Sequence, residues 1–181
     1  MNEVMHKTFI SYHHADQDEV EDFIKAFDYE GKVFITRALG VGMEQDIIDS
    51  NDTDYIMRRI RELYLKDSTV TIVLVGKCTW ARRYVDWEIQ ASLRHGEKTT
   101  PNGLLGIILP SAGRENIHAP NRLLINLKGK NHDEEYARWH WYTNNEDSLI
   151  SWIEDAFNAR ISRANLIENP RERFANNRTC S

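Results

Sequence analysis

Two runs of apolar residues constrain the fold of this chain more strongly than any other feature of its sequence. Val70–Val75 is rich in β-branched residues, and Leu104–Leu109 is nonpolar throughout. Runs of this length and composition are typical of strands that are buried on both faces in the middle of a parallel sheet. Between them, Val85, Ile89 and Leu93 form the apolar stripe of a helix that begins near residue 84.

The rest of the chain alternates between strand and helix patterns in the same way. Strands are predicted at residues 8–12, 33–35 and 138–142, and helices at residues 18–28, 54–66 and 148–160. A helical turn fits residues 44–48, and Leu123–Leu127 fits either a strand or a short helix. This order predicts an α/β fold in which helices cover both faces of an open parallel sheet. Right-handed crossovers favour a flavodoxin-like sheet of about five strands in the order 2-1-3-4-5.

The composition limits the function classes that the chain can belong to. It has 181 residues, of which 41% are hydrophobic, and a net charge of −5. This size fits one domain, and the negative charge argues against a nucleic-acid binder. We find no stretch of about 20 apolar residues and no signal-peptide core, so no membrane partner is expected. Cys78 and Cys180 lack metal-ligand spacing and are too few for a disulfide framework, which fits a cytoplasmic location.

Several familiar catalytic motifs are absent from the sequence. It contains neither the GxGxxG fingerprint of dinucleotide-binding folds nor the GxxxxGK[ST] phosphate loop. The GxSxG sequence of serine hydrolases is also missing. A phosphorylated receiver domain would need acidic residues at the ends of the first and third strands. Ser11-Tyr12-His13 and Val75-Gly76 stand there instead.

Polar residues gather after the first and third predicted strands, which are neighbours in this sheet order. They are Ser11, Tyr12, His13, His14 and Asp16 after the first strand, and Thr79, Trp80, Arg82, Arg83 and Glu88 after the third. The carboxyl ends of these strands meet at the switch point where open α/β sheets bind ligands. Such a crevice suits a ligand with a planar ring, hydroxyls and phosphates. Tyr12 and Trp80 could stack on a base, and Arg82 and Arg83 could hold phosphates.

Simpler interpretations of the same residues stay open. Glu88 fits a surface carboxylate that is favoured by the dipole of its helix, and Arg82-Arg83 fits a solvated pair. His13, His14 and Asp16 resemble metal ligands, but adjacent histidines on an extended chain point apart. We therefore expect a structural role in the loop and no metal.

Two segments of the sequence resemble TIR-type domains. KTFISYHHADQD at residues 7–18 is similar to their opening strand and loop, where a hydrophobic strand ends in Ser-Tyr or Ser-Phe before an Asp. DSTVTIVLVGKCTWARRYVDWEI at residues 67–89 resembles, more specifically, the ThsB-type TIR-like domains of bacterial Thoeris anti-phage systems. The resemblance covers roughly residues 7–160. It implies a TIR-like domain at residues 1–160, followed by a polar extension at residues 161–181.

The resemblance implies a chemistry for the crevice. TIR enzymes break the nicotinamide–ribose bond of NAD, and their essential glutamate, which lies on the helix after the third strand, matches Glu88. NAD is then a substrate, and no cofactor is needed. Thoeris TIR proteins join the resulting ADP-ribose to itself, and the cyclic ADP-ribose isomer activates a separate effector protein. Tyr12 and Trp80 would exclude water, and His13 would donate a hydrogen bond to ribose or pyrophosphate.

Two other functions remain open on the sequence. The chain fits a non-catalytic TIR-like module that binds a nucleotide or a protein, with Glu88 as a structural residue. It also fits an enzyme like the nucleoside deoxyribosyltransferases, which share the sheet and a catalytic glutamate. Residues 38–50 lack the Pro-Gly motif of the BB loop in animal TIR domains, which argues against adaptor-type assembly. A homo-oligomer is compatible with the sequence.

Overall fold

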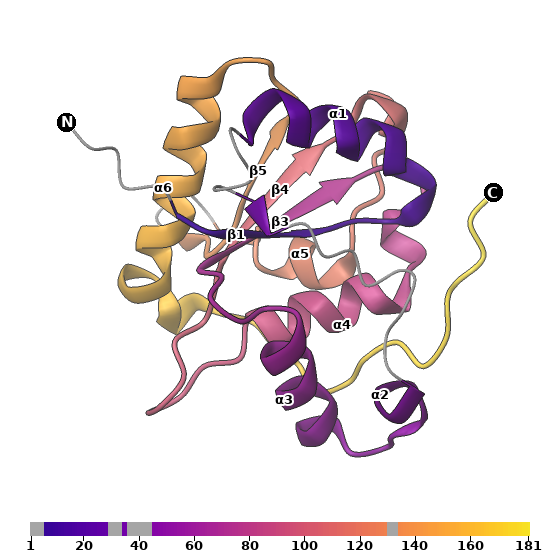
Figure 1. The fold of residues 1–181 in the computed structure, drawn as a ribbon, viewed down its shortest axis with the longest axis vertical. Coiled ribbons are helices and arrows are strands. Elements are labelled where there is room, and N and C mark those ends of the chain that lie inside the picture. The colour runs from indigo at the N-terminus through magenta and orange to yellow at the C-terminus, as the bar shows by residue number, and fades with distance from the viewer. Residues whose placement is uncertain (1–5, 29–33, 36–44, 130–133) are drawn as a thin grey trace.

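Residues 6–28, 34–35, 45–129 and 134–181 are described by a computed structural model, in which they form a three-layer α/β fold (Figure 1). The middle layer is a sheet of five strands: β1 (Thr8–Ser11), β2 (Phe34–Ile35), β3 (Val70–Val75), β4 (Gly103–Ile108) and β5 (Arg138–Trp141). Their order is β2-β1-β3-β4-β5, and every neighbouring pair is parallel. The predicted flavodoxin-like sheet is confirmed.

Helices cover both faces of this sheet because the buried strands carry apolar side chains on both sides. Ile72 and Leu74 of β3 pack in one hydrophobic cluster with α1 (Gln17–Phe27) and α6 (Glu146–Ser162). Val73 and Val75 pack on the opposite face with α4 (Arg83–Ser92) and α5 (Asn121–Ile125). On that same face, α2 (Gln45–Asp49) and α3 (Thr53–Leu63) pack beyond α4 (Figure 1).

The loops at the carboxyl ends of the strands are ordered by single turns of 3-10 helix. These turns are η1 (His14–Asp16) after β1, η3 (Thr79–Ala81) after β3 and η4 (Pro110–Ala112) after β4. Since β1 and β3 are hydrogen-bonded neighbours with Ser11 opposite Val73, η1 and η3 lie at the same edge of the sheet. The candidate residues of the site come from these two turns and from α4.

The structure settles the segment that the sequence left between strand and helix. Residues 121–125 form α5, which follows Pro120 at its N-cap. The helical turn considered at residues 44–48 corresponds to α2, and α4 ends at Ser92. Because the chain after α4 turns back through a bridge between Gly96 and Thr99, the helix cannot continue.

The polar C-terminal segment has a defined course in the structure. After α6 it forms the short turn η6 (Ala164–Leu166) and then runs along α5 and α4 toward the carboxyl end of β3 (Figure 1). Cys78 and Cys180, which are 102 positions apart in sequence, form a disulfide there. From the sequence, the two cysteines are too few for a disulfide framework, and this single bond was not predicted, because their spacing in sequence carries no information about their distance in the fold. No helix in the described ranges combines the length and apolarity needed to cross a membrane.

Candidate active site

Glu88 is a buried carboxylate in the middle of α4. Its side chain is 1% exposed, and the hydroxyl of Ser11 at the end of β1 donates a hydrogen bond to its Oε2. Ser11 is itself fully buried. Glu88 is therefore not a dipole-favoured surface residue. Because β1 and β3 are adjacent, the helix that follows β3 places this carboxylate against the carboxyl end of β1.

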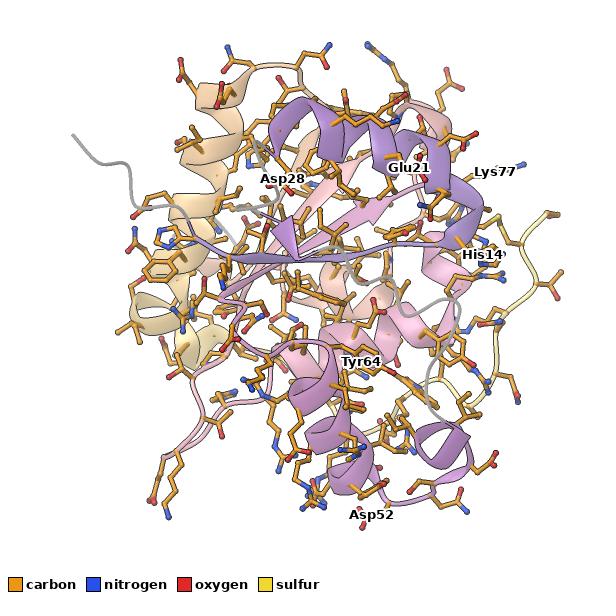
Figure 2. The ribbon with its side chains drawn as sticks, viewed as in Figure 1. His14, Glu21, Asp28, Asp52, Tyr64 and Lys77 are labelled. Carbon is orange, nitrogen blue, oxygen red and sulfur yellow. A yellow bond between two sulfur atoms is a disulfide. The ribbon has the colours of Figure 1, made fainter. Side chains whose placement is uncertain are left out.

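The loop after β1 and the start of α4 enclose a small cavity. Its volume is about 60 Å³, and its walls include Tyr12, His13, Arg82 and Val85. His14, Tyr84 and the C-terminal Asn177 complete the lining. Figure 2 shows His14 and Lys77 at the same edge of the molecule, where the loops after β1 and β3 meet. Glu88 is not among the lining residues and lies one helical turn after Val85.

The ionisable groups of the cavity respond to their burial. Loss of solvent, together with the smaller effects of the neighbouring His14 and Arg82, lowers the pKa of His13 to about 4. His13 is thus a neutral imidazole at physiological pH, able to donate one hydrogen bond and accept another. Burial also raises the pKa of Tyr12, which donates a hydrogen bond to Gln17 at 2.7 Å, and the charge of Glu88 contributes to that rise.

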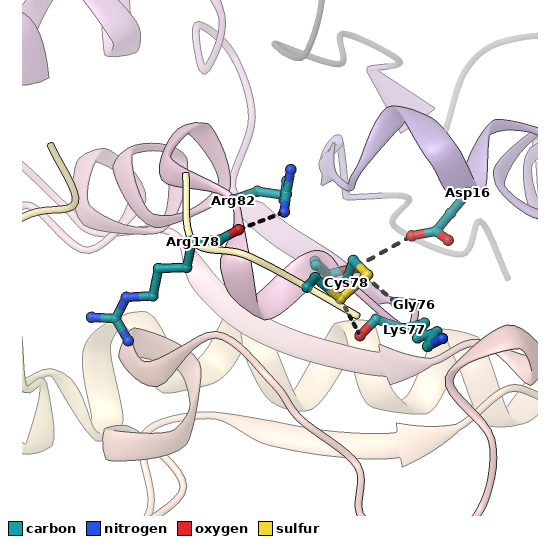
Figure 3. The surroundings of a disulfide bond; sticks show 8 residues. Asp16, Gly76, Lys77, Cys78, Arg82 and Arg178 are labelled. Carbon is teal, nitrogen blue, oxygen red and sulfur yellow. Dashed lines mark hydrogen bonds between the residues drawn. A yellow bond between two sulfur atoms is a disulfide. The ribbon is translucent and has the colours of Figure 1, made fainter. Parts of the chain in front are cut away.

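Asp16 and Thr79 join the two loops beneath the site. The Thr79 hydroxyl donates to Asp16 Oδ2 at 3.3 Å and accepts from the Gly76 amide at 2.8 Å (Figure 3). A Cβ at position 76 would overlap the Asp16 carboxylate, so the close approach of the two loops requires glycine. Burial raises the pKa of Asp16, while the hydrogen bond from Thr79 opposes that rise. These two residues, predicted to bind substrate, bond to each other in the structure.

Trp80 lies apart from Tyr12. Its ring packs near the ring of His118 at 5.6 Å, and both line a second cavity of about 370 Å³. The end of the C-terminal segment, at residues 179–181, forms part of the wall of this cavity. The structure thus does not bring Tyr12 and Trp80 together as two walls of one pocket.

The two arginines before and at the start of α4 are engaged by the C-terminal segment. Arg82 Nη2 donates to the carbonyl of Arg178 at 2.9 Å, and Arg83 Nη1 donates to the carbonyl of Ala175 at 3.1 Å. The Arg83 amide donates to Asn177 Oδ1 at 3.0 Å. Among the described residues, the buried Nε of Arg82 has no hydrogen-bond partner.

The role of the C-terminal segment is the feature that the sequence did not reveal. Polar side chains on the inner sides of α4 and α5 hold its backbone, and they recur at helical spacing: Asp86 and Gln90 on α4, and Arg122 and Asn126 at α5. Arg122 forms a buried ion pair with Asp86 at 2.9 Å and donates to three groups of the segment, the side chain of Asn169 and the carbonyls of Pro170 and Glu172. On each of the two helices, two polar residues stand four positions apart at places that are buried in the fold. Such a pair on a buried helix face needs hydrogen-bond partners, and this signal could have indicated that another segment covers the helices.

Metal binding finds no support in the geometry of the described residues. No three His, Cys, Asp or Glu side chains among them gather closely enough to hold an ion. The rings of His13 and His14 meet edge to face, with centroids 4.4 Å apart.

The parallel sheet order, the switch point between β1 and β3 and the glutamate on the following helix together define a TIR-like α/β domain. A profile of the TIR-like domain of the Thoeris protein ThsB matches residues 9–114, more than half of the chain. The chain therefore belongs to this family of ThsB TIR-like domains. The match runs from β1 to just beyond η4 and includes Glu88. A comparison with curated protein sequences gives no match.

Proposed function

We propose that this protein is an NAD-consuming enzyme of anti-phage defence that cleaves the nicotinamide–ribose bond at Glu88. The observation that carries the proposal is the buried Glu88 carboxylate, which is held by Ser11 at the switch point of a ThsB-type TIR-like domain. A carboxylate taken out of water and fixed by a neighbouring hydroxyl is prepared to stabilise a developing positive charge.

The chemistry follows from the leaving of nicotinamide. As the C–N bond breaks, its electron pair leaves with nicotinamide, and the ribose carbon gains oxocarbenium character. The Glu88 carboxylate stabilises that carbon and orients the ribose hydroxyls. A nucleophile of the same ADP-ribose then attacks the carbon and yields a cyclic ADP-ribose isomer, provided that water is excluded. Attack by water would yield free ADP-ribose instead.

The groups around the small cavity fit the remaining parts of NAD. Neutral His13 can donate a hydrogen bond to ribose or pyrophosphate. The buried Nε–H of Arg82, which has no hydrogen-bond partner among the described residues, can donate to an anionic group. The Tyr12 ring provides an apolar wall. In this proposal the enzyme works in the cytoplasm, where NAD is available, and its diffusible product activates a separate effector protein.

The proposal is tested by nicotinamide release from NAD, measured with purified protein under reducing conditions and again after addition of extract from phage-infected cells. We expect release by the wild type and by Glu21→Gln, a surface control on α1. We expect none by Glu88→Gln, provided that circular dichroism shows an intact fold. Equal release by wild type and Glu88→Gln would remove Glu88 from the mechanism.

One observation favours a second function, a non-catalytic nucleotide- or protein-binding signalling module. The small cavity lined by Tyr12, His13 and Arg82 measures about 60 Å³, whereas pockets for ligands of drug size span roughly 300–1,000 Å³. This function expects NAD to stay intact in every condition. It also expects binding of a nucleotide or a protein that is indifferent to Glu88→Gln.

A further inference from the structure

The C-terminal segment consists of two parts that are held in different ways. We call residues 168–174 the anchor and residues 175–181 the strap. The anchor is bound by buried or half-buried groups: Asn126 bonds both backbone groups of Glu168, and the carbonyl of Phe174 accepts from Trp87 Nε1 at 2.8 Å. The Phe174 amide donates to Asp86 Oδ2 at 3.0 Å. The anchor is thus bonded to buried groups of α4 and α5, although its own residues are half-buried or exposed.

The strap is held by exposed contacts and by one covalent bond. Residues 175–179 are all exposed, and their hydrogen bonds to Arg82 and Arg83 lie at the surface. Beyond them, Cys180 is bonded to Cys78, directly before η3 (Figure 3). Exposed hydrogen bonds of this kind open readily, so the disulfide is the contact that fixes the strap in place.

The strap occupies the donors that an anionic ligand would use. Its oxygens accept from Arg82 Nη2, from Arg83 Nη1 and from the Arg83 amide at the first position of α4. Neither Arg82 nor any other local side chain caps this helix, and Asn177 of the strap supplies the acceptor instead. Two guanidinium groups and a backbone N–H at a helix N-terminus are donors that suit phosphate oxygens.

The strap also narrows both cavities of the site. Asn177 forms one wall of the small cavity that includes Tyr12 and His13, and residues 179–181 line the larger cavity that includes Trp80. If the strap moves away, each of the two cavities loses one of its walls and becomes wider. The small volume of the cavity lined by Tyr12 and His13 then reflects the closed position of the strap.

We propose that the strap is a redox-controlled cover of the site, which competes with the pyrophosphate group of the ligand for Arg82 and Arg83. A dithiol reductant transfers two electrons and two protons to the Cys78–Cys180 bond. The Sγ–Sγ bond breaks, two thiols form, and the reductant becomes a disulfide. The strap then swings away from a pivot after Phe174 while the anchor stays in place. The pyrophosphate as ligand rests on the proposed function, whereas the release of the strap rests on the contacts alone.

Hydrogen exchange of individual amides, followed by NMR in the full-length protein, tests the release. The Arg83 amide and the Arg178 amide, which donates to Ala81 at 2.8 Å, report on the strap, and the Phe174 amide reports on the anchor. We expect reduction to speed exchange of the two strap reporters by about tenfold or more, with Phe174 unchanged. Cys180→Ser should exchange fast with or without reductant. Equal exchange of both reporters in the oxidised and reduced wild type would overturn the proposal.

Binding of inorganic pyrophosphate gives a second readout that needs no turnover. The reduced wild type should bind pyrophosphate about tenfold more tightly than the oxidised form, because a covered site lowers apparent affinity by the fraction that is open. The same affinity in both forms would contradict competition for the two arginines. The two proposals fail separately. If reduction speeds exchange of the strap reporters but nicotinamide is not released in any condition, the strap proposal stands and the proposed enzyme activity is wrong. If exchange of the strap reporters does not depend on reduction, the strap proposal is wrong, whether or not nicotinamide is released.

Discussion

Among single residues, the proposed reaction depends most on how the carboxylate of Glu88 is held. Glu88 is buried on α4, and Ser11, which comes from a different strand, donates a hydrogen bond to it. In the proposed mechanism Ser11 therefore acts as a positioning residue, whereas the sequence predicted that it binds substrate. Its effect on the reaction should act through the orientation of Glu88.

Removal of the hydrogen bond from Ser11 to Glu88 distinguishes a residue that positions Glu88 from one that contacts the substrate. Ser11→Ala should lower the rate of nicotinamide release by about tenfold, the value of one hydrogen bond to a charged group. Glu88→Gln should lower it by about a thousandfold or more. Steady-state kinetics on both variants checks this order, and Ser11→Thr, which keeps the hydroxyl, should recover part of the loss. A loss in Ser11→Ala as large as in Glu88→Gln would mean that Ser11 itself contacts the reacting atoms.

His13 leads to a prediction about stability and pH. Its pKa is lowered from 6.5 to about 4 in the folded protein, so between these values the unfolded chain binds a proton that the folded chain does not. The contribution of His13 to stability is complete above pH 6.5 and is lost as the pH falls toward 4. Urea unfolding across this range should show a steeper decline in the wild type than in His13→Gln. Parallel curves would show that His13 titrates normally in the fold.

At the scale of elements, α4 joins the site to the C-terminal segment. One side of this helix carries Glu88, and Asp86 and Gln90 hold the anchor. Asp86 pairs with Arg122 of α5, and the side chains of this pair are 9% and 5% exposed. The anchor therefore depends on a buried charge pair whose groups also bond the backbone of the anchor.

Breaking the ion pair between Asp86 and Arg122 should lower the free energy of unfolding considerably. Arg122→Met leaves Asp86 buried without its cation and removes the donors to the anchor, so we expect a loss of roughly 3–5 kcal/mol in the free energy of unfolding. Denaturant unfolding measures it. Lys25→Met is the matched control, because Lys25 pairs with Glu21 at 3.9 Å on an exposed surface, and its loss should stay within about 0.5 kcal/mol. A similar small change in both variants would show that the pair does not support the fold.

Elements with a clear pattern were predictable from the sequence. The apolar runs of β3 and β4 and the stripe of α4 follow from burial on both faces, and short crossovers then leave few sheet orders. Leu123–Leu127 was ambiguous because a five-residue apolar run has no resolvable period. The course of the strap and the anchor was not predictable from their own residues, because a nonperiodic segment held mostly through its backbone carries no pattern. The polar pairs on α4 and α5 could have indicated only that some segment covers these helices.

At the scale of the whole molecule, the disulfide ties the last residues of the chain to the loop after the central strand. Closing a loop of 102 residues restricts the unfolded chain strongly, and we expect reduction to lower the free energy of unfolding by about 2–4 kcal/mol. Urea unfolding with and without a dithiol checks this. Cys180→Ser should match the reduced wild type, and a variant that instead matches the oxidised protein would show that the disulfide does not form in solution.

Mass spectrometry of small molecules in cells that express this protein, with and without phage challenge, tests whether the protein consumes NAD through Glu88. The account expects NAD to fall after challenge and a species with the mass of cyclic ADP-ribose to appear. Cells that express Glu88→Gln at the same level should show neither change. Free ADP-ribose alone would retain the role of Glu88 but make the enzyme a hydrolase. If the levels of NAD and its derivatives stay unchanged after challenge with several phages that cells expressing this protein resist, the proposed NAD-consuming activity is wrong.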